Sequence, residues 1–208
     1  EDLWPNDLRR FGAYADQKYT MDRITESFTY GYSVVYPGAE HLVGRPLRTS
    51  AIYDRLTEKG ALFCARHGWE SPLMFVREGT VKDSQPTFGK PGWFDQVAAE
   101  CQAVHNNVGI LDLTAMVKFE VSGPDAEEFL DQLCTNQLPE EEGRMVENLM
   151  LNESGGIECY LNITRLADEC FYLTGPSIAE RHHLDWLQRH LPKNNDARIE
   201  NVTERDGI

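Results

Sequence analysis

The alternation of apolar and polar positions is clearest in Gly155–Leu166, GGIECYLNITRL. Two glycines predict a tight turn, and the residues after them alternate with a period of two, which is typical of a half-buried β-strand. The apolar face suits a protein core and consists of Ile157, Cys159, Leu161 and Ile163. The opposite face carries a carboxylate, a phenol and an amide, from Glu158, Tyr160 and Asn162. That polar face is either a hydrated surface or the wall of a binding site.

Similar patterns predict regular elements throughout residues 93–208. The predicted elements are a helix from 93 to about 107, a strand at 116–121, a helix after 125, strands at 146–151, 157–164 and 170–174, and a helix at 176–191. The predicted strand MVKFEV buries Val117, Phe119 and Val121. In the last helix, the residues expected to face inward are Ile178, His182, Trp186 and Leu187. This order predicts an α+β fold with a mostly antiparallel sheet and flanking helices.

The first 92 residues predict smaller elements, helical and extended. We expect a helix over 16–30, a short β-like run at 34–36, and a helix that begins after Thr49 or Ser50 and ends near Gly60. The polar stretch REGTVKDSQPTFGKPG, residues 77–92, is punctuated by glycine and proline. It therefore reads as an exposed connector.

Charge narrows the possible partners. The net charge is −14, and the longest cluster of basic residues is the pair Arg9-Arg10. Because such a chain repels polyanions, we expect no nucleic-acid partner and no binding to anionic membranes. No apolar run approaches membrane-spanning length, and no signal peptide is recognisable. Five separated cysteines without a CxxC pair favour reduced thiols, so we expect a cytoplasmic protein, with the mitochondrial matrix as the alternative.

Common catalytic and metal-binding motifs give little guidance. The sequence has no phosphate-binding loop, no GxGxxG and no GxSxG elbow. His182, His183 and Asp185 suggest a metal site, but neighbouring residues on a helix point about 100° apart. We therefore predict no metal centre.

The two ends of the sequence favour a piece of a longer polypeptide. It begins EDLWPND without an initiator methionine and stops at ERDGI without a closing element. Trimming for expression is the simpler alternative.

Five segments, taken in order, resemble one enzyme family. They are GRPLRTSAIYDRL, HGWESPLMF, PGWFDQVAAE, ILDLTAMVKFEVSGPDAEEFLDQL and MLNESGGIECYLNITRL. Together they resemble the dimethylglycine dehydrogenase, sarcosine dehydrogenase and dimethylglycine oxidase family. In that family a flavin domain is fused to a domain like the aminomethyltransferase (T-protein) of the glycine-cleavage system.

The resemblance implies a domain organisation. Residues 1–75 would be the tail of the flavin oxidoreductase part and its connecting segment, 76–92 a linker, and 93–208 the first part of the folate-binding domain. FAD would be bound mainly by an upstream domain, and tetrahydrofolate by the second part. The flavin part of the family oxidises an N-methylated amine, and tetrahydrofolate captures the one-carbon unit. The segment by itself would be inactive.

The resemblance also implies candidate folate contacts. Met116 matches a methionine that lines the folate pocket, and Tyr172 with Thr174 matches a position that packs on the ligand and bonds to it. Ordinary core packing is the alternative for all three. No catalytic residue is assigned.

One position departs from the family pattern. The acid that the family carries on the strand after Gly155-Gly156 aligns with Tyr160, and a phenol of pKa near 10 supplies no negative charge at neutral pH. Glu158, two residues earlier, is the candidate substitute. Two alternatives therefore stay open: a non-catalytic regulator like the regulatory subunit of pyruvate dehydrogenase phosphatase, and an oxidase whose folate domain is degenerate and which releases formaldehyde.

Overall fold

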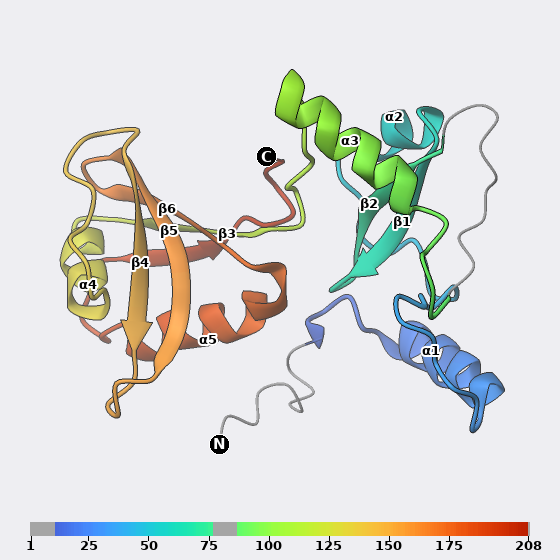
Figure 1. Ribbon diagram of the computed structural model, residues 1–208. Helices are drawn as coiled ribbons and strands as arrows, with labels where there is room; N and C mark the ends of the chain where they lie inside the picture. Colours follow the sequence, from blue (N-terminus) through green and yellow to red (C-terminus); the bar gives the residue numbers. More distant parts are fainter. Residues whose placement is uncertain (1–10, 77–86, 208) are drawn as a thin grey trace. The chain divides into compact units, whose positions relative to one another are not determined.

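The structure, a computed structural model, describes residues 11–76 and 87–207 (Figure 1). The chain divides into two compact units, which are described separately. The hairpin unit is Ala13–Ala115, and the sheet unit contains Met116 and the residues after it. Most of the predicted linker, residues 77–86, lies outside the described residues. The predicted boundaries at 75 and 93 remain predictions.

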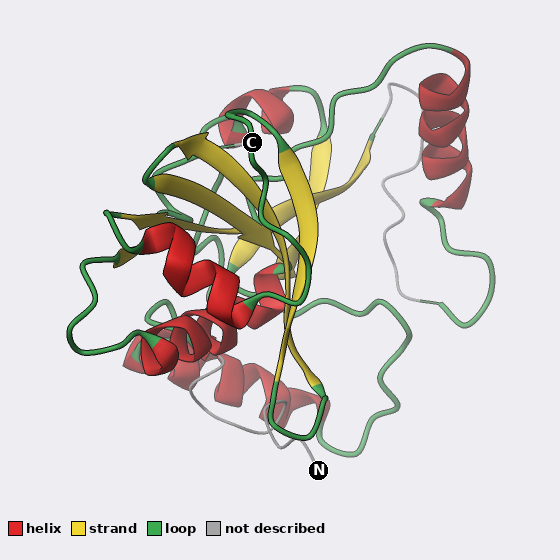
Figure 2. Cartoon of the chain, turned by 90° about the vertical axis from the view of Figure 1, so that its left-hand side faces the viewer, coloured by secondary structure: helices red, strands yellow, loops and turns green. Residues whose placement is uncertain are grey.

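The sheet unit is built on five antiparallel strands, drawn as yellow arrows in Figure 2. They are β3 (Val117–Ser122), β4 (Met145–Leu151), β5 (Ile157–Ala167), β6 (Cys170–Gly175) and β7 (Arg198–Asn201). Their order across the sheet is β4-β5-β6-β3-β7, which places β3 between β6 and β7. The helices of the unit are α4 (Ala126–Leu133) and α5 (Glu180–His190), the latter preceded by the 3-10 turn Ser177–Ala179. The predicted α+β fold is confirmed.

Both helices pack on the same face of this sheet. The core combines Phe129 and Leu130 of α4 and Leu187 of α5 with alternate residues of the strands. The strand residues of the core include Val117, Phe119, Val121, Cys159, Leu161, Ile163, Phe171 and Leu173. Each such side chain contributes on the order of 1.5–3 kcal/mol when it is fully buried. The period-two pattern of the sequence therefore identified the buried side of β3 and β5, except at Ile157, which was expected in the core and is 65% exposed.

The last helix differs from its predicted orientation. Leu187 is buried and Trp186 packs against the core as predicted, but Ile178 is 57% exposed and the buried histidine is His183 in place of His182. The α-helix begins only at Glu180, after the 3-10 turn, so a stripe counted from residue 176 is out of phase with the real one. Strand β7 has only four residues, RIEN, and was not predicted because so short a run carries no clear period.

The hairpin unit contains α1 (Gln17–Tyr30), α2 (Tyr53–Glu58), α3 (Phe94–Asn106) and the antiparallel pair β1 (Ala61–Arg66) and β2 (Trp69–Phe75). The helices match the predicted ones, and the side chain of Asp16 caps α1 by accepting from the Tyr19 amide at 2.7 Å. The β-like run at residues 34–36 is wrong, since no strand forms there and Val34 is 72% exposed.

A stacked arginine and a buried ion pair hold the hairpin in place. Trp69 is 3% exposed, and the Arg48 guanidinium lies 4.4 Å from the centroid of its ring. Arg45 pairs with Glu70 of β2 at 2.6 Å, and both side chains are largely buried. The hairpin was missed because its apolar residues form no regular alternation, whereas its turn residues His67 and Gly68 do adopt positive φ.

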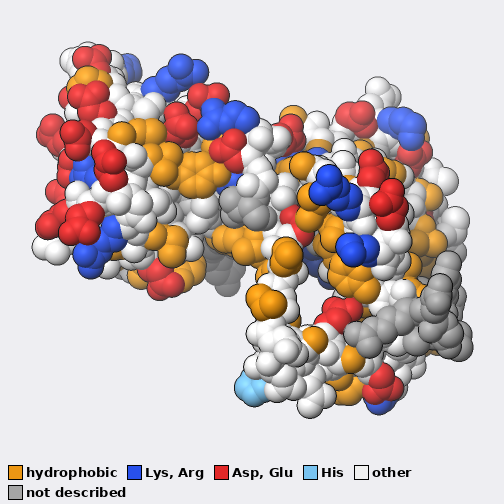
Figure 3. Space-filling model, turned by 90° about the horizontal axis from the view of Figure 1, so that it is seen from above, with side chains coloured by type: hydrophobic (Ala, Val, Ile, Leu, Met, Phe, Trp, Pro, Cys, Tyr) orange, Lys and Arg blue, Asp and Glu red, His pale blue; other side chains and the backbone are white. Residues whose placement is uncertain are grey.

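Part of the apolar surface remains open. None of the residues of α3 is buried, although the helix was predicted from its apolar stripe. Hydrophobic side chains, orange in Figure 3, reach the surface, and Ile110 is 98% exposed.

Within 11–76 and 87–207, no helix has the length and hydropathy that a membrane span requires. All five cysteines are free thiols.

A glycine test probes the turn between β3 and α4. Gly123 has φ of +119°, and a β-carbon there would meet the backbone oxygen of Asp196. We expect Gly123→Ala to lower the free energy of unfolding by about 3 kcal/mol, because strain and overlap combine. Gly143→Ala is the control, since its φ is +77° with open space around it, and it should cost about 1 kcal/mol. Denaturant titration measures both, and equal costs would contradict the close approach.

A buried histidine should make the sheet unit sensitive to acid. His183 is 3% exposed, and burial, with a smaller effect of His182, lowers its pKa to about 4. The unfolded chain takes up this proton near pH 6.5, so stability is present above that pH and is lost as pH falls toward 4. We expect His183→Gln to remove about 2–3 kcal/mol of this pH dependence. Urea titrations of the wild type and the variant at each pH measure the difference, and an unchanged pH dependence in His183→Gln would contradict this role of His183.

Candidate functional site

The sheet face opposite the core, called the open face below, carries the candidate site. Because side chains alternate along a strand, the residues between the core positions point to this face. The open face also includes the apolar Met145 and Leu149 of β4, which pair with Thr164 and Tyr160. Its polar residues are Lys118 and Glu120 of β3, Glu147 of β4, Tyr160, Asn162 and Thr164 of β5, and Tyr172 and Thr174 of β6. The polar face noted in the sequence of β5 is therefore one part of a larger polar surface.

Strand pairing brings these residues into two neighbouring rows. In the first row Glu147 pairs with Asn162, Asn162 with Thr174, and Thr174 with Lys118. In the second row Thr164 pairs with Tyr172, Tyr172 with Glu120, and Glu120 with Glu200 of β7. Side chains directly opposite each other on neighbouring strands lie about 4.5–5.5 Å apart at their β-carbons. Residues far apart in sequence thus form one continuous surface.

Four of the five predicted site residues are associated with this face. Tyr172 and Thr174 lie on β6, half-buried, and Met116 lies directly before β3 and is also half-buried. Neither Met116 nor Tyr172 belongs to the buried core. Tyr160 is 47% exposed, and the neighbouring carboxylate of Glu147 raises its pKa. Their roles as folate contacts remain predictions.

Glu158, the fifth predicted residue, has other partners. Leu151 pairs with Ile157 and Met150 pairs with Cys159, so Glu158 is the extra residue of a β-bulge. One of its carboxylate oxygens accepts from the Asn152 side chain at 2.8 Å, and the other lies 3.1 Å from Nε2 of His182 on α5. Both oxygens are therefore engaged at the turn and the helix. The bulge explains why counting along the strand does not locate this carboxylate.

A buried lysine, Lys118 of β3, lies on the open face. Lys118 has no exposed surface, and its Nζ donates to the backbone oxygen of Met116 at 2.8 Å. A buried ammonium group requires such partners because desolvation of a charge is costly. The Lys118 amide also donates to Oγ1 of Thr203 at 3.0 Å.

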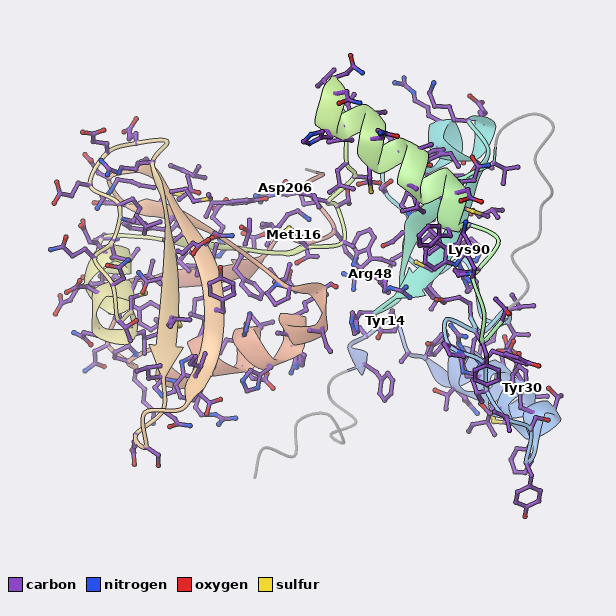
Figure 4. All side chains as sticks on the ribbon, in the orientation of Figure 1. Tyr14, Tyr30, Arg48, Lys90, Met116 and Asp206 are labelled. Atoms are coloured by element: carbon purple, nitrogen blue, oxygen red, sulfur yellow. The ribbon has the colours of Figure 1, made fainter. Side chains whose placement is uncertain are left out.

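The segment Val202–Asp206, called the crossing segment below, follows β7 and contacts the strands of the open face. The Val202 amide donates to the Lys118 carbonyl, which continues the line of β7 along the outer side of β3. Oδ2 of Asp206 accepts from the Tyr172 hydroxyl at 3.2 Å, and Tyr172 belongs to β6 on the other side of β3. The segment therefore contacts both β3 and β6. Figure 4 labels Asp206 and Met116 at the same end of the sheet.

Arg205 connects this crossing segment to the strands. Its Nε donates to Oδ1 of Asp206 at 3.0 Å, and Nη2 donates to Glu120 of β3 at 3.1 Å. The hydrogen bond from Arg205 is the largest cause that lowers the pKa of Asp206, and Tyr172 and Lys118 act in the same direction. Burial, followed by the charge of Asp206, raises the pKa of Tyr172 to about 12. At neutral pH the pair is thus a protonated phenol that donates to an ionised carboxylate.

Three residues of this arrangement were not foreseen from the sequence. The alternation of MVKFEV already assigned Lys118 to the polar side, so the sequence contained a signal for it. Arg205 and Asp206 lie in a segment without periodicity, and their contacts reach back to β3 and β6. Only the crossing of the chain brings them to the face.

The histidine pair of α5 is divided between two environments. His182 contacts Glu158, whereas His183 is buried beneath the sheet. In the part of the chain that the structure describes, no group of three or more His, Cys, Asp or Glu side chains could hold a metal ion.

The family of the chain follows from comparison with known proteins. Residues 52–207 match the model of the GCVT N-terminal domain, and residues 1–50 match the FAD dependent oxidoreductase central domain. The chain belongs to the GCVT N-terminal domain family. The resemblance to the dimethylglycine and sarcosine dehydrogenases is also confirmed.

Individual relatives agree with this placement. The mitochondrial pyruvate dehydrogenase phosphatase regulatory subunit of Mus musculus is 35% identical over 98% of the chain, and the mitochondrial dimethylglycine dehydrogenase of Homo sapiens is 31% identical over 100% of it. The chain spans 24% of the length of each of these relatives. Aminomethyltransferase T from Bartonella henselae shares the fold, with a TM-score of 0.55 and 24% identity over 76% of this chain and 38% of that one.

The Tyr172–Asp206 contact leads to a spectroscopic prediction. Asp206→Asn should lower the pKa of Tyr172 from about 12, but not to 10, because burial is the larger cause of the shift. Ultraviolet titration of tyrosinate, with a Tyr172→Phe variant to assign the signal, measures the change. Asp168→Asn in the exposed β5–β6 turn is the control and should leave the titration unaltered. An unchanged Tyr172 titration in Asp206→Asn would refute the contact.

Proposed function

We propose that this chain is part of a flavin-dependent N-methylglycine demethylase, acting on dimethylglycine or sarcosine, that passes the one-carbon unit to tetrahydrofolate. The open face forms one wall of the folate site. The observation that carries the proposal is the continuous polar surface of β5, β6 and β3, in a chain of the GCVT N-terminal domain family. The match of residues 1–50 to an FAD dependent oxidoreductase domain supports the flavin part.

The residues of the open face suit a reduced pterin. A flat heterocycle with several N–H and C=O groups needs an aromatic or thioether surface together with hydrogen-bonding partners. Met116 supplies a polarizable thioether, Tyr172 a ring and a hydroxyl oxygen, and Thr174 and Asn162 further polar groups. Tyr160 adds an exposed ring at the position where the family carries an acid.

These residues would position the acceptor, which supplies a nucleophilic nitrogen for the one-carbon unit when it is bound. Met116 and Tyr160 would limit the tilt of the ring, and Tyr172 and Asn162 would fix its rotation. Holding the acceptor close to the source of a reactive one-carbon unit raises the effective concentration and limits its loss to water.

We infer the mitochondrial matrix as the compartment, in preference to the cytoplasm. The support is that both curated relatives described above are mitochondrial by name. The partner is a small N-methylated amine. Neither nucleic acid nor a membrane surface is proposed as a partner, because the net charge is −14.

The enzymatic proposal is tested with the full-length protein. Dimethylglycine or sarcosine should reduce the bound flavin, and added tetrahydrofolate should convert the product from trapped formaldehyde to methylenetetrahydrofolate. No amine-dependent flavin reduction would reject the oxidoreductase assignment. Flavin reduction with formaldehyde alone, at every folate concentration, would identify an oxidase with a degenerate folate domain.

A regulatory subunit is the second candidate. Its specific support is the 35% identity to a pyruvate dehydrogenase phosphatase regulatory subunit, together with the tyrosine at position 160. A regulator on this scaffold would not turn over amines. It would instead alter the activity of a partner enzyme.

Restoring the acid distinguishes these two candidates. In an enzyme, Tyr160→Asp should increase the rate of methylenetetrahydrofolate formation by about 100-fold, the lower range for a positioned acid or base. Tyr160→Asn, which changes size in the same way without adding charge, is the matched control. Equal rates in the two variants would argue against a weakened folate site and for a regulator or a folate-independent oxidase.

A further inference from the structure

Position 160 carries a tyrosine and supplies no negative charge, but another carboxylate, that of Asp206, lies on the open face. Asp206 reaches this face from the crossing segment, and its side chain is 31% exposed. It is a carboxylate on the same surface as Met116 and Thr174, although it comes from the far end of the sequence. Its position therefore differs from the family position on β5.

The hydrogen bonds of Asp206 determine what it can bind. A carboxylate has about four acceptor sites, and the described contacts of Asp206 come from Arg205 and Tyr172. Oδ1 accepts one bond from Arg205 at 3.0 Å. It therefore keeps an acceptor site for a ligand.

Tyr172 becomes an acceptor through the same contact. Its proton is directed to Oδ2 of Asp206, so the lone pairs of the hydroxyl oxygen are what it can offer to a ligand. Tyr172 and Asp206 together therefore present two neighbouring acceptors and no donor. Such a pair suits adjacent N–H groups and disfavours a carbonyl or a carboxylate.

Positive charges keep the carboxylate of Asp206 ionised but do not occupy all of its acceptor sites. Arg205 binds Asp206 from one side and is itself shared with Glu120 and, at 4.0 Å, with Glu200. Lys118 lies beneath the crossing segment, with its ammonium group bonded to the Met116 carbonyl. Bonds to an ionised acceptor are about twice as strong as neutral ones.

We propose that Asp206, with Tyr172, binds the adjacent amino and ring N–H groups of the reduced pterin and so supplies, from the crossing segment, the carboxylate that β5 lacks. This rests on the proposed folate site. Asp206 acts as a binding and orienting residue, and no proton is transferred by it. The anionic glutamate tail of the ligand is directed away from this carboxylate, since like charges repel.

The test is calorimetric titration of the full-length protein with 5-formyltetrahydrofolate. Two smaller probes separate the halves of this ligand: 6,7-dimethyltetrahydropterin, used without oxygen, and p-aminobenzoylglutamate. Asp206→Asn keeps the size of the side chain but turns an N–H donor toward the N–H groups of the ligand. It should weaken 5-formyltetrahydrofolate and the tetrahydropterin by about 10- to 100-fold and leave p-aminobenzoylglutamate unchanged.

Two controls keep this result interpretable. Asp168→Asn removes an equal charge from the exposed β5–β6 turn and should bind all three probes as the wild type does. A variant that is merely less well folded would lose affinity for both halves of the ligand, whereas the proposal requires a loss confined to the probes that contain the pterin. Asp206→Glu should recover part of the lost affinity because it restores the charge.

The outcomes distinguish the role of Asp206 from the existence of the folate site. Wild-type binding together with unchanged pterin affinity in Asp206→Asn overturns the role of Asp206 and leaves the folate site standing. A loss that falls on p-aminobenzoylglutamate also overturns it, because the carboxylate would then act on the tail. Failure of the wild type to bind any of the probes removes the folate site and this inference with it.

Discussion

Strand β3 carries buried residues on both of its faces, and the arrangement of the sheet unit depends on how each face is covered. Its odd-numbered residues, Val117, Phe119 and Val121, have no exposed surface and fill the core beneath the helices. On the other side Lys118 is equally buried, so a charged group lies within the sheet unit. Burial of an ammonium group is tolerated only when oxygen atoms surround it. The Met116 carbonyl accepts from this ammonium group, and the segment that bonds to the backbone of Lys118 brings Asp206 to the open face.

This arrangement connects stability to function. The segment that bonds to the backbone of Lys118 also carries the carboxylate that accepts from Tyr172 and the guanidinium that binds this carboxylate. The carboxylate of Asp206 comes from the segment that follows β7, and not from one of the strands of the open face. Its charge is placed by contacts to β3 and β6, and so it does not depend on the residue at position 160 of β5.

The relatives share a scaffold but differ in role. This chain is 31% identical to a dehydrogenase and 35% identical to a regulatory subunit. The fold by itself therefore does not distinguish between catalysis and regulation. The choice depends on the chemistry of the open face. In the proposed folate site, this chemistry depends on Tyr160, Tyr172 and Asp206.

The sequence by itself determined the local elements and the buried side of the sheet. Period-two and helical patterns located β3, β5, β6, α4 and α1, because burial of one face leaves a direct trace in residue order. The pattern failed where that trace is weak: the hairpin of β1 and β2, the four residues of β7 and the phase of α5. The tertiary structure alone decided that Tyr172 meets Asp206, that Glu158 turns to His182 in a bulge, and that Lys118 lies under a crossing segment. These contacts join residues up to 85 positions apart, and they depend on strand order and register, which local periodicity does not encode.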